Sequence, residues 1–152
     1  MKIVEDWNEN TGVAKCTIYY KSRAFEGIAQ CHPNDEDMQS RLTGLTIANL
    51  RAELEYLKYE YNKTRAGLDA LNQLYYSMNR SKNFNEKSYE NSMLQRQIHQ
   101  SKFALDTISK MLASTKQEIK TYIEGKEQFY QTVRKKRAAK TEQLETENFQ
   151  NI

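Results

Sequence analysis

Proline is almost missing from this chain. The only proline among the 152 residues is Pro33, so nothing after it forces a helix to break. The five glycines are scattered and form neither G-x-G-x-x-G nor G-x-x-x-x-G-K, which removes the two common glycine-rich phosphate loops. The stretch after Pro33 therefore permits very long helices and carries no phosphate-loop motif.

Cysteine and histidine are also scarce, with two of each. Their spacing matches no recognised zinc pattern. Cys31 adjoins His32, but neighbouring side chains of a strand point to opposite faces, so this pair cannot form a nucleophile–base dyad within a strand. We therefore expect no enzymatic activity, no catalytic residue, no metal site and no cofactor.

Long apolar segments are lacking as well. No apolar run approaches the roughly 18 residues of a membrane-spanning helix. Residues 1–10 contain Glu5, Asp6 and Glu9 instead of the apolar centre of a secretory signal. These observations predict a cytoplasmic protein whose cysteines are free thiols packed inside the fold.

An excess of either charge is missing too, because 23 basic and 20 acidic residues leave a net charge of +3. This charge is too small to predict binding along a nucleic-acid duplex. The basic run Arg134–Arg137 is either solvated or a local nucleic-acid contact. Asp35, Glu36 and Asp37 lack the glycine and glutamate of a calcium loop, and we interpret them as acids at a helix N-terminus.

The N-terminal residues have the pattern of a small β-unit. Lys2–Trp7, Val13–Tyr20 and Ala24–His32 are expected strands, and the second is rich in β-branched and aromatic residues. Turn-forming residues 8–12 separate the first two. The predicted fold class is α+β and mainly α, with an N-terminal antiparallel meander followed by a helical hairpin.

Two long helices are expected, from about Asp35 to Met78 and from about Glu86 to beyond Val133. Both carry a seam of residues spaced three and four apart, joined by a turn over residues 79–85 into an antiparallel hairpin. We expect one domain over residues 1–133, made of a β-unit (1–33) and the hairpin (34–133), and a frayed or disordered tail (134–152). The seams are Ile47, Leu50, Leu54, Leu57, Tyr61, Thr64, Leu68, Leu71, Tyr75 and Met78, then Leu94, Ile98, Ser101, Leu105, Ile108, Leu112, Thr115, Ile119, Tyr122, Lys126, Phe129 and Val133.

Further apolar residues lie off these seams. A chain with 38% hydrophobic residues has little to spare for a surface that stays in water. A second apolar face on long helices is typical of association with another chain. We therefore expect a homo-oligomer, in which the off-seam residues Leu45, Leu74, Tyr76, Phe103 and Met111 contribute to the contact.

The segment from Arg80 to Arg96 is the most suggestive of a ligand site. Cations bind phosphate, aromatic rings stack on bases, and amides hydrogen-bond to base or ribose edges. The segment also lies where a helix begins, and free N–H groups there attract anions. The alternative is an ordinary polar loop whose aromatic residues close the end of the core. The candidate ligand residues are Phe84, Asn91, Arg80, Lys82, Tyr89 and Arg96.

Several stretches resemble a family of small proteins from bacterial viruses. These are Gly27–Pro33 followed by acids, Thr43-Gly44, Ile47–Ala52 and the stretch from Phe84 to Asn91 in a helical hairpin. Together they are similar to the first type of Thoeris anti-defence protein. That family sequesters, without cleaving it, the cyclic ADP-ribose isomer made by the host's immune sensor, between protomers of a dimer or larger oligomer. Some members also take up cyclic oligonucleotides at a second site.

The resemblance implies specific expectations for this chain. It implies a protein in the host bacterial cytoplasm that binds a cyclic ADP-ribose-type nucleotide and blocks anti-phage defence. The family's stacking aromatic and polar asparagine correspond to Phe84 and Asn91, and the four other candidates follow by proximity. Arg51 is the candidate for a second nucleotide site. Two alternatives stay open: a structural or adaptor coiled-coil protein of a bacteriophage with no small-molecule ligand, and a nucleic-acid-binding protein.

Overall fold

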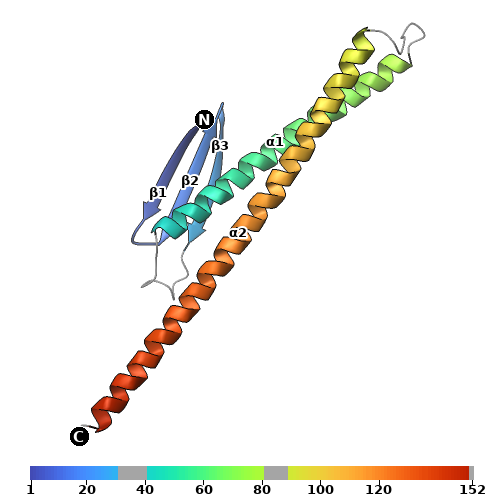
Figure 1. Ribbon diagram of the computed structural model, residues 1–152. Coiled ribbons are helices and arrows are strands. Elements are labelled where there is room, and N and C mark those ends of the chain that lie inside the picture. The colour runs from blue at the N-terminus through green and yellow to red at the C-terminus, as the bar shows by residue number, and fades with distance from the viewer. Residues whose placement is uncertain (31–40, 81–88, 151–152) are drawn as a thin grey trace.

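The fold consists of a small sheet and two long helices. The computed structural model describes residues 1–30, 41–80 and 89–150. The strands form one antiparallel sheet in the order β1-β2-β3, and the helices follow (Figure 1). This confirms the predicted α+β, mainly α architecture. The elements are β1 (Lys2–Asn8), β2 (Val13–Tyr20), β3 (Arg23–Gln30), α1 (Arg41–Asn79) and α2 (Tyr89–Gln150).

Tight turns set the register of the sheet. Asn8 organises the first turn, because its Oδ1 accepts hydrogen bonds from the backbone N–H of Asn10 at 3.0 Å and of Thr11 at 3.3 Å. Tyr20 pairs directly with Arg23, so only two residues connect β2 to β3. The first of them, Lys21, has a φ of 55°, as two-residue hairpin turns require. The predicted strands are confirmed over the described residues, with the first ending one residue later and the third beginning one residue earlier than expected. The predicted end of the third strand at His32 lies outside the described residues.

Helix α1 lies against one face of the sheet, mainly over β3 and β2. The approach is close because small residues meet at the contact. A Cβ atom on Gly27 would collide with the backbone of Ala48 and Ala52, and one on Gly44 would lie 2.9 Å from the ring of Trp7. Residue size therefore fixes how α1 sits on the sheet. The small residues are Ala14, Gly27 and Ala29 of the sheet and Gly44, Ala48 and Ala52 of α1.

A short polar chain crosses this contact. The Cys16 thiol, which is 0% exposed, donates to Oδ1 of Asn49 at 2.7 Å. Nδ2 of Asn49 donates in turn to a carboxylate oxygen of Glu5 at 2.5 Å. Residues of β1, β2 and α1 are thereby linked, and both polar groups of the asparagine are satisfied. Burial, followed by the negative charge of Glu5, raises the pKa of the Cys16 thiol.

This thiol should be unreactive in the folded protein, because the nucleophile is the thiolate and both burial and the raised pKa suppress it. In a Cys31→Ser variant, labelling by an aromatic disulfide reagent at pH 8 should be at least about 100-fold slower in the native state than in guanidinium chloride. Equal rates in the two states would contradict the burial of Cys16.

Aromatic rings close one end of the contact between α1 and the sheet. Tyr56 meets both Tyr20 and Phe25 edge-on, with ring centroids 5.5 Å apart in each pair. The Phe25 and Tyr59 rings also pack together, with centroids 5.3 Å apart. The Arg23 guanidinium lies 4.7 Å from the centre of the Tyr59 ring. Burial raises the pKa of Tyr56. Such ring pairs add to the burial of apolar area, so this end of the sheet is firmly held to α1.

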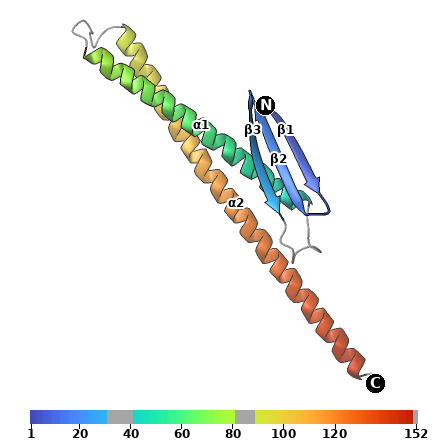
Figure 2. The same ribbon diagram turned by 180° about the vertical axis from the view of Figure 1, so that it is seen from behind.

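The two helices form the predicted antiparallel hairpin (Figure 2). Every residue of the predicted seam on α1 is at least partly buried. On α2 the same holds for all seam residues except Phe129, which is 59% exposed. The three-and-four spacing therefore identified the less exposed side of each helix, although Ile47 packs against the core between α1 and the sheet. A buried apolar cluster of Leu68, Leu94 and Ile98 lies near the hairpin end.

Two expectations differ from the structure. The predicted frayed or disordered tail is wrong as far as Gln150, because α2 continues through it. No glycine or proline follows Gly125, and alanine, glutamate, glutamine and lysine are strong helix formers. Leu45 was assigned to a contact with another chain, but it packs against the core between α1 and the sheet.

The long α2 extends well past α1. It has 62 residues against 39 in α1, and its C-terminal part lies beyond both α1 and the sheet (Figure 1). Among the described residues, no helix is both long enough and apolar enough to cross a membrane.

Candidate functional site: a groove between the two helices

A cavity of about 340 Å³ lies between α1 and α2 near the hairpin end. Its volume is within the range of roughly 300–1,000 Å³ that is usual for small-molecule sites. We call it the hairpin groove. It is lined by Asn72, Tyr75 and Tyr76 of α1 and by Gln95, Ile98, His99 and Lys102 of α2.

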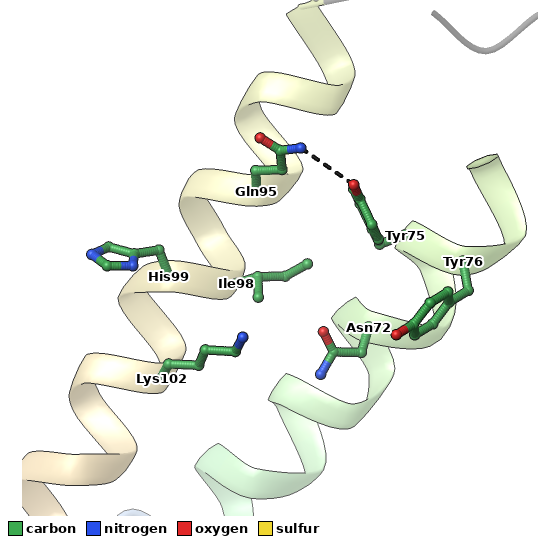
Figure 3. Close-up of a pocket in the computed structure, with 7 residues that line it drawn as sticks. All are labelled: Asn72, Tyr75, Tyr76, Gln95, Ile98, His99 and Lys102. Carbon is green, nitrogen blue, oxygen red and sulfur yellow. Dashed lines mark hydrogen bonds between the residues drawn. The ribbon is translucent and has the colours of Figure 1, made fainter. Parts of the chain in front are cut away.

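The side chains of the groove approach it from both helices (Figure 3). Gln95, Ile98 and Lys102 extend from α2 toward α1, whereas the His99 ring points away from α1. Nε2 of Gln95 donates to the Tyr75 hydroxyl at 3.3 Å, which ties the two helices together at this edge of the groove. Ile98 is 9% exposed and belongs to the buried cluster, so it forms an apolar floor.

The position of the groove follows from the helical repeat. Asn72 and Tyr76 each come one residue after a seam residue of α1, and Gln95, His99 and Lys102 each come one residue after a seam residue of α2. One residue is a turn of about 100° in a helix, so these side chains stand beside the contact line. A polar stripe on each helix therefore flanks the same stretch of the hairpin.

The groove combines three kinds of binding group. Tyr76 is 66% exposed, so most of its ring is accessible for stacking, and it forms a T-shaped pair with the Tyr75 ring at 6.1 Å between centroids. Lys102 supplies a cation for phosphate, and the amides of Asn72 and Gln95 supply donors and acceptors. An aromatic face, a cation and amides together are what recognition of a base and its phosphate requires.

Of the six residues predicted as ligands, two lie outside the described residues, three are exposed and one is buried. Phe84 and Lys82 lie outside the described residues. Tyr89 begins α2 and is 74% exposed, while Arg96 is an exposed residue of α2. Arg80 is exposed just after α1, and its N–H donates to the Tyr76 carbonyl at 3.3 Å. Arg80 is therefore one helical turn from the groove.

Asn91 has a different environment from the one expected of a ligand-binding asparagine at a surface. It is 0% exposed, although it is the third residue of α2. In the single chain its side chain is therefore part of the packing near the hairpin end. A substitution of Asn91 should therefore change the stability of the helix pair. Its effect on ligand affinity has to be measured together with its effect on the melting temperature.

Arg51, the candidate for a second nucleotide site, is remote from the other candidates. It lies on the part of α1 that covers the sheet, and its Nη1 donates to the Ile28 carbonyl at 2.5 Å. Roughly 38 Å of helix separate it from Tyr76 at 1.5 Å per residue. The structure thus places Arg51 at the edge of β3, where its guanidinium already has a backbone partner.

Most residues of the groove were not predicted from the sequence as ligand residues. Tyr75 was treated as a seam residue and Tyr76 as an oligomer contact, while the amides and Lys102 were passed over. The available signal was the pairing of polar residues one position after the seam on both helices. Over residues 1–30, 41–80 and 89–150, three or more histidine, cysteine, aspartate or glutamate side chains nowhere gather as a metal site would require.

The chain was compared with protein-family models, curated proteins and solved structures. No family model, no curated protein and no solved structure matches it.

Proposed function

We propose that this protein binds a cyclic ADP-ribose-type signalling nucleotide in the hairpin groove and sequesters it without cleaving it. The observation that carries the proposal is the meeting of an open aromatic face, a cation and two amides around one cavity of about 340 Å³. The resemblance to the first type of Thoeris anti-defence protein supplies the identity of the nucleotide. It also supplies the biological consequence, which is to block host anti-phage defence.

The groups have distinct roles in this proposal. The adenine base stacks on Tyr76, whose ring is mostly exposed. Lys102 approaches the pyrophosphate, and Arg80 adds a second cation one turn away on α1. Asn72 and Gln95 hydrogen-bond to the ribose or the base. The apolar floor at Ile98 excludes water beneath the ligand, which strengthens the polar contacts above it.

Sequestration fits this set of side chains better than turnover does. Stacking, charge pairing and amide hydrogen bonds bind the intact nucleotide. Such contacts accelerate a reaction only if they are stronger in its transition state than in the bound substrate. Cleavage needs a positioned nucleophile or general base, and His99, the imidazole of the groove, points away from α1 (Figure 3). Nucleotide bound by the protein should therefore be released intact when the protein is heated.

The test is calorimetry of cyclic ADP-ribose isomers with the parent and with Tyr76→Ala. Stacking of a base on an aromatic ring contributes roughly 1–3 kcal/mol, so loss of the ring should weaken binding about tenfold or more. Lys102→Ala should act in the same direction, with a larger effect at low salt. Phe84→Ala tests the site implied by the family resemblance.

Phe103→Ala is the matched control, because Phe103 is an equally exposed aromatic residue at 71% next to Lys102 that does not line the groove. Its affinity should equal that of the parent. If Tyr76→Ala and Lys102→Ala also bind like the parent while Phe84→Ala does not, the ligand lies elsewhere than the groove. If the parent binds none of the isomers, the proposal fails.

The second candidate is a structural or adaptor protein that acts through its helices. The C-terminal part of α2 favours it, since this part carries the exposed apolar residues Phe129, Leu144 and Phe149. Truncation after residue 128 separates the two candidates. A nucleotide-binding protein keeps its affinity when shortened there, whereas an adaptor loses its interaction.

A further inference from the structure

β1 is exposed along nearly its whole length, which is unusual for a strand that contains Ile3, Val4 and Trp7. Ile3 is 54% and Val4 40% exposed, and of the seven residues only Trp7 is partly buried. β1 forms the outer edge of the sheet in both views (Figures 1 and 2), and α1 contacts it much less than β2 or β3. An exposed apolar edge strand has unpaired backbone N–H and C=O groups that can pair with a strand of another chain.

The backbone groups at this edge can be assigned from the register. Tyr20 and Arg23 flank a two-residue turn, so their N–H and C=O groups point at each other. These groups alternate in direction along a strand, so the odd-numbered residues of β2 face β1. The odd-numbered residues of β2 pair with even-numbered residues of β1, for example Thr17 with Val4. The backbone groups of the even-numbered residues of β1 therefore point toward β2. The N–H and C=O groups of Ile3 and Glu5 therefore point outward.

The two edges of the sheet differ in protection. At the β3 edge, Arg51 reaches from α1 and donates to the outward carbonyl of Ile28 at 2.5 Å. The same edge lies under α1, with which β3 has many contacts. For β1, the described residues provide no comparable cover. Capping one edge and leaving the other open makes the β1 edge the place where the sheet can extend.

Charge selects how a second β1 would pair there. In antiparallel pairing about a twofold axis at Val4, Ile3 lies opposite Glu5 of the second copy, with their outward backbone groups facing. Lys2 of each copy then lies opposite Asp6 of the other copy, which gives two opposite-charge pairs on the face away from α1. Pairing about Glu5 would instead place two glutamates opposite each other. Opposite charges stabilise cross-strand pairs and like charges destabilise them, so the Val4 register is favoured over the Glu5 register.

We infer that β1 is a homotypic interface: two copies pair their β1 edges about Val4 and form one continuous six-stranded sheet. This inference is independent of the proposed nucleotide site, because the hairpin groove lies at the other end of α1. It is also distinct from a contact through the off-seam residues of the helices. The sheet interface leaves Tyr76 exposed.

Two single charge reversals test the register. Lys2→Asp places aspartates opposite aspartates in a pair of identical chains, and Asp6→Lys places lysines opposite lysines. Each variant alone should show half the parent's mass by light scattering, down to 17.9 kDa if the parent is a dimer. Mixed in equal amounts, the two variants regain both opposite-charge pairs and should return to the parent's mass.

The mixing experiment separates this interface from other effects. A misfolded variant or a contact elsewhere would not be rescued by the other variant. A parent of 17.9 kDa at micromolar concentration, an unchanged mass of either single variant, or a mixture that fails to reassociate would each overturn the proposal.

A cross-link provides a second, direct test. Residues on the axis in this register form a non-hydrogen-bonded pair with Cα atoms about 4.5 Å apart, which is within disulfide range. In a Cys31→Ser background, Val4→Cys should therefore oxidise to a covalent dimer within minutes under mild oxidant. Lys2→Cys, whose equivalent lies more than about 10 Å away at 3.4 Å per residue, should stay monomeric on a denaturing gel. Equal cross-linking of both variants would contradict the register.

Discussion

Gly27→Ala should destabilise the protein severely, although it adds a single methyl group. The added Cβ would overlap the backbone of Ala48 and Ala52 in α1, and neither is a flexible side-chain end that can move away. The helix would have to lift from the sheet along a core built from small residues. Overpacking of this kind costs about 3 kcal/mol, which lowers the melting temperature by roughly 6–12 °C for a chain of this size.

Gly67→Ala is the matched control for this prediction. Gly67 is an exposed residue in the middle of α1, and a Cβ there would meet nothing within 4 Å. The same substitution should raise stability by up to about 1 kcal/mol, since alanine is the better helix former. Thermal unfolding followed by circular dichroism measures both. Opposite signs are expected, and equal shifts would show that α1 does not lie against β3 as described.

Leu57→Glu should have the other large effect. Leu57 is 4% exposed on the seam of α1. A carboxylate at this position would lose its hydration, and the protein would lose the apolar contacts of the leucine. The combined cost is about 3–5 kcal/mol at neutral pH. Chemical denaturation at pH 7 should show the loss as a lower midpoint with an unchanged slope.

Leu74→Glu introduces the same charge on the same helix at a residue that is 50% exposed, and it should change stability by less than about 1 kcal/mol. Burial favours the neutral carboxyl group and raises its pKa. The destabilisation by Leu57→Glu is therefore full above that raised pKa and shrinks as the pH falls through it. If both variants unfold alike at pH 7, the seam is misplaced.

The architecture could be predicted from the sequence because its signals are local and repeated. The β-branched and aromatic residues of Val13–Tyr20 indicate a strand, and the three-and-four spacing from Ile47 onward follows the helical period over many residues. The exact bounds of β2 and the at least partial burial of nearly every seam residue confirm those patterns. The prediction for the tail was wrong because it rested on the basic run Arg134–Arg137 and the glutamates that follow, although the tail is rich in strong helix formers.

The groove was harder to predict because it depends on which residues of two helices come level with each other. Asn72 and Lys102 are 30 positions apart, and nothing in either helix alone marks them as neighbours. The segment from Arg80 to Arg96 was predicted as the ligand site because its cations, amides and aromatic residues lie close together in the sequence. Buried Asn91 shows the limit of that reasoning, since a polar residue near a loop can belong to the packing.

The length of α2 has a consequence for how the molecule moves through solution. A helix of 62 residues spans roughly 93 Å at 1.5 Å per residue, several times the width of the sheet it passes. A particle of such axial ratio has a frictional coefficient well above that of a sphere of equal mass. Even a single chain should therefore elute early from a gel-filtration column, as a compact protein of considerably more than 17.9 kDa would.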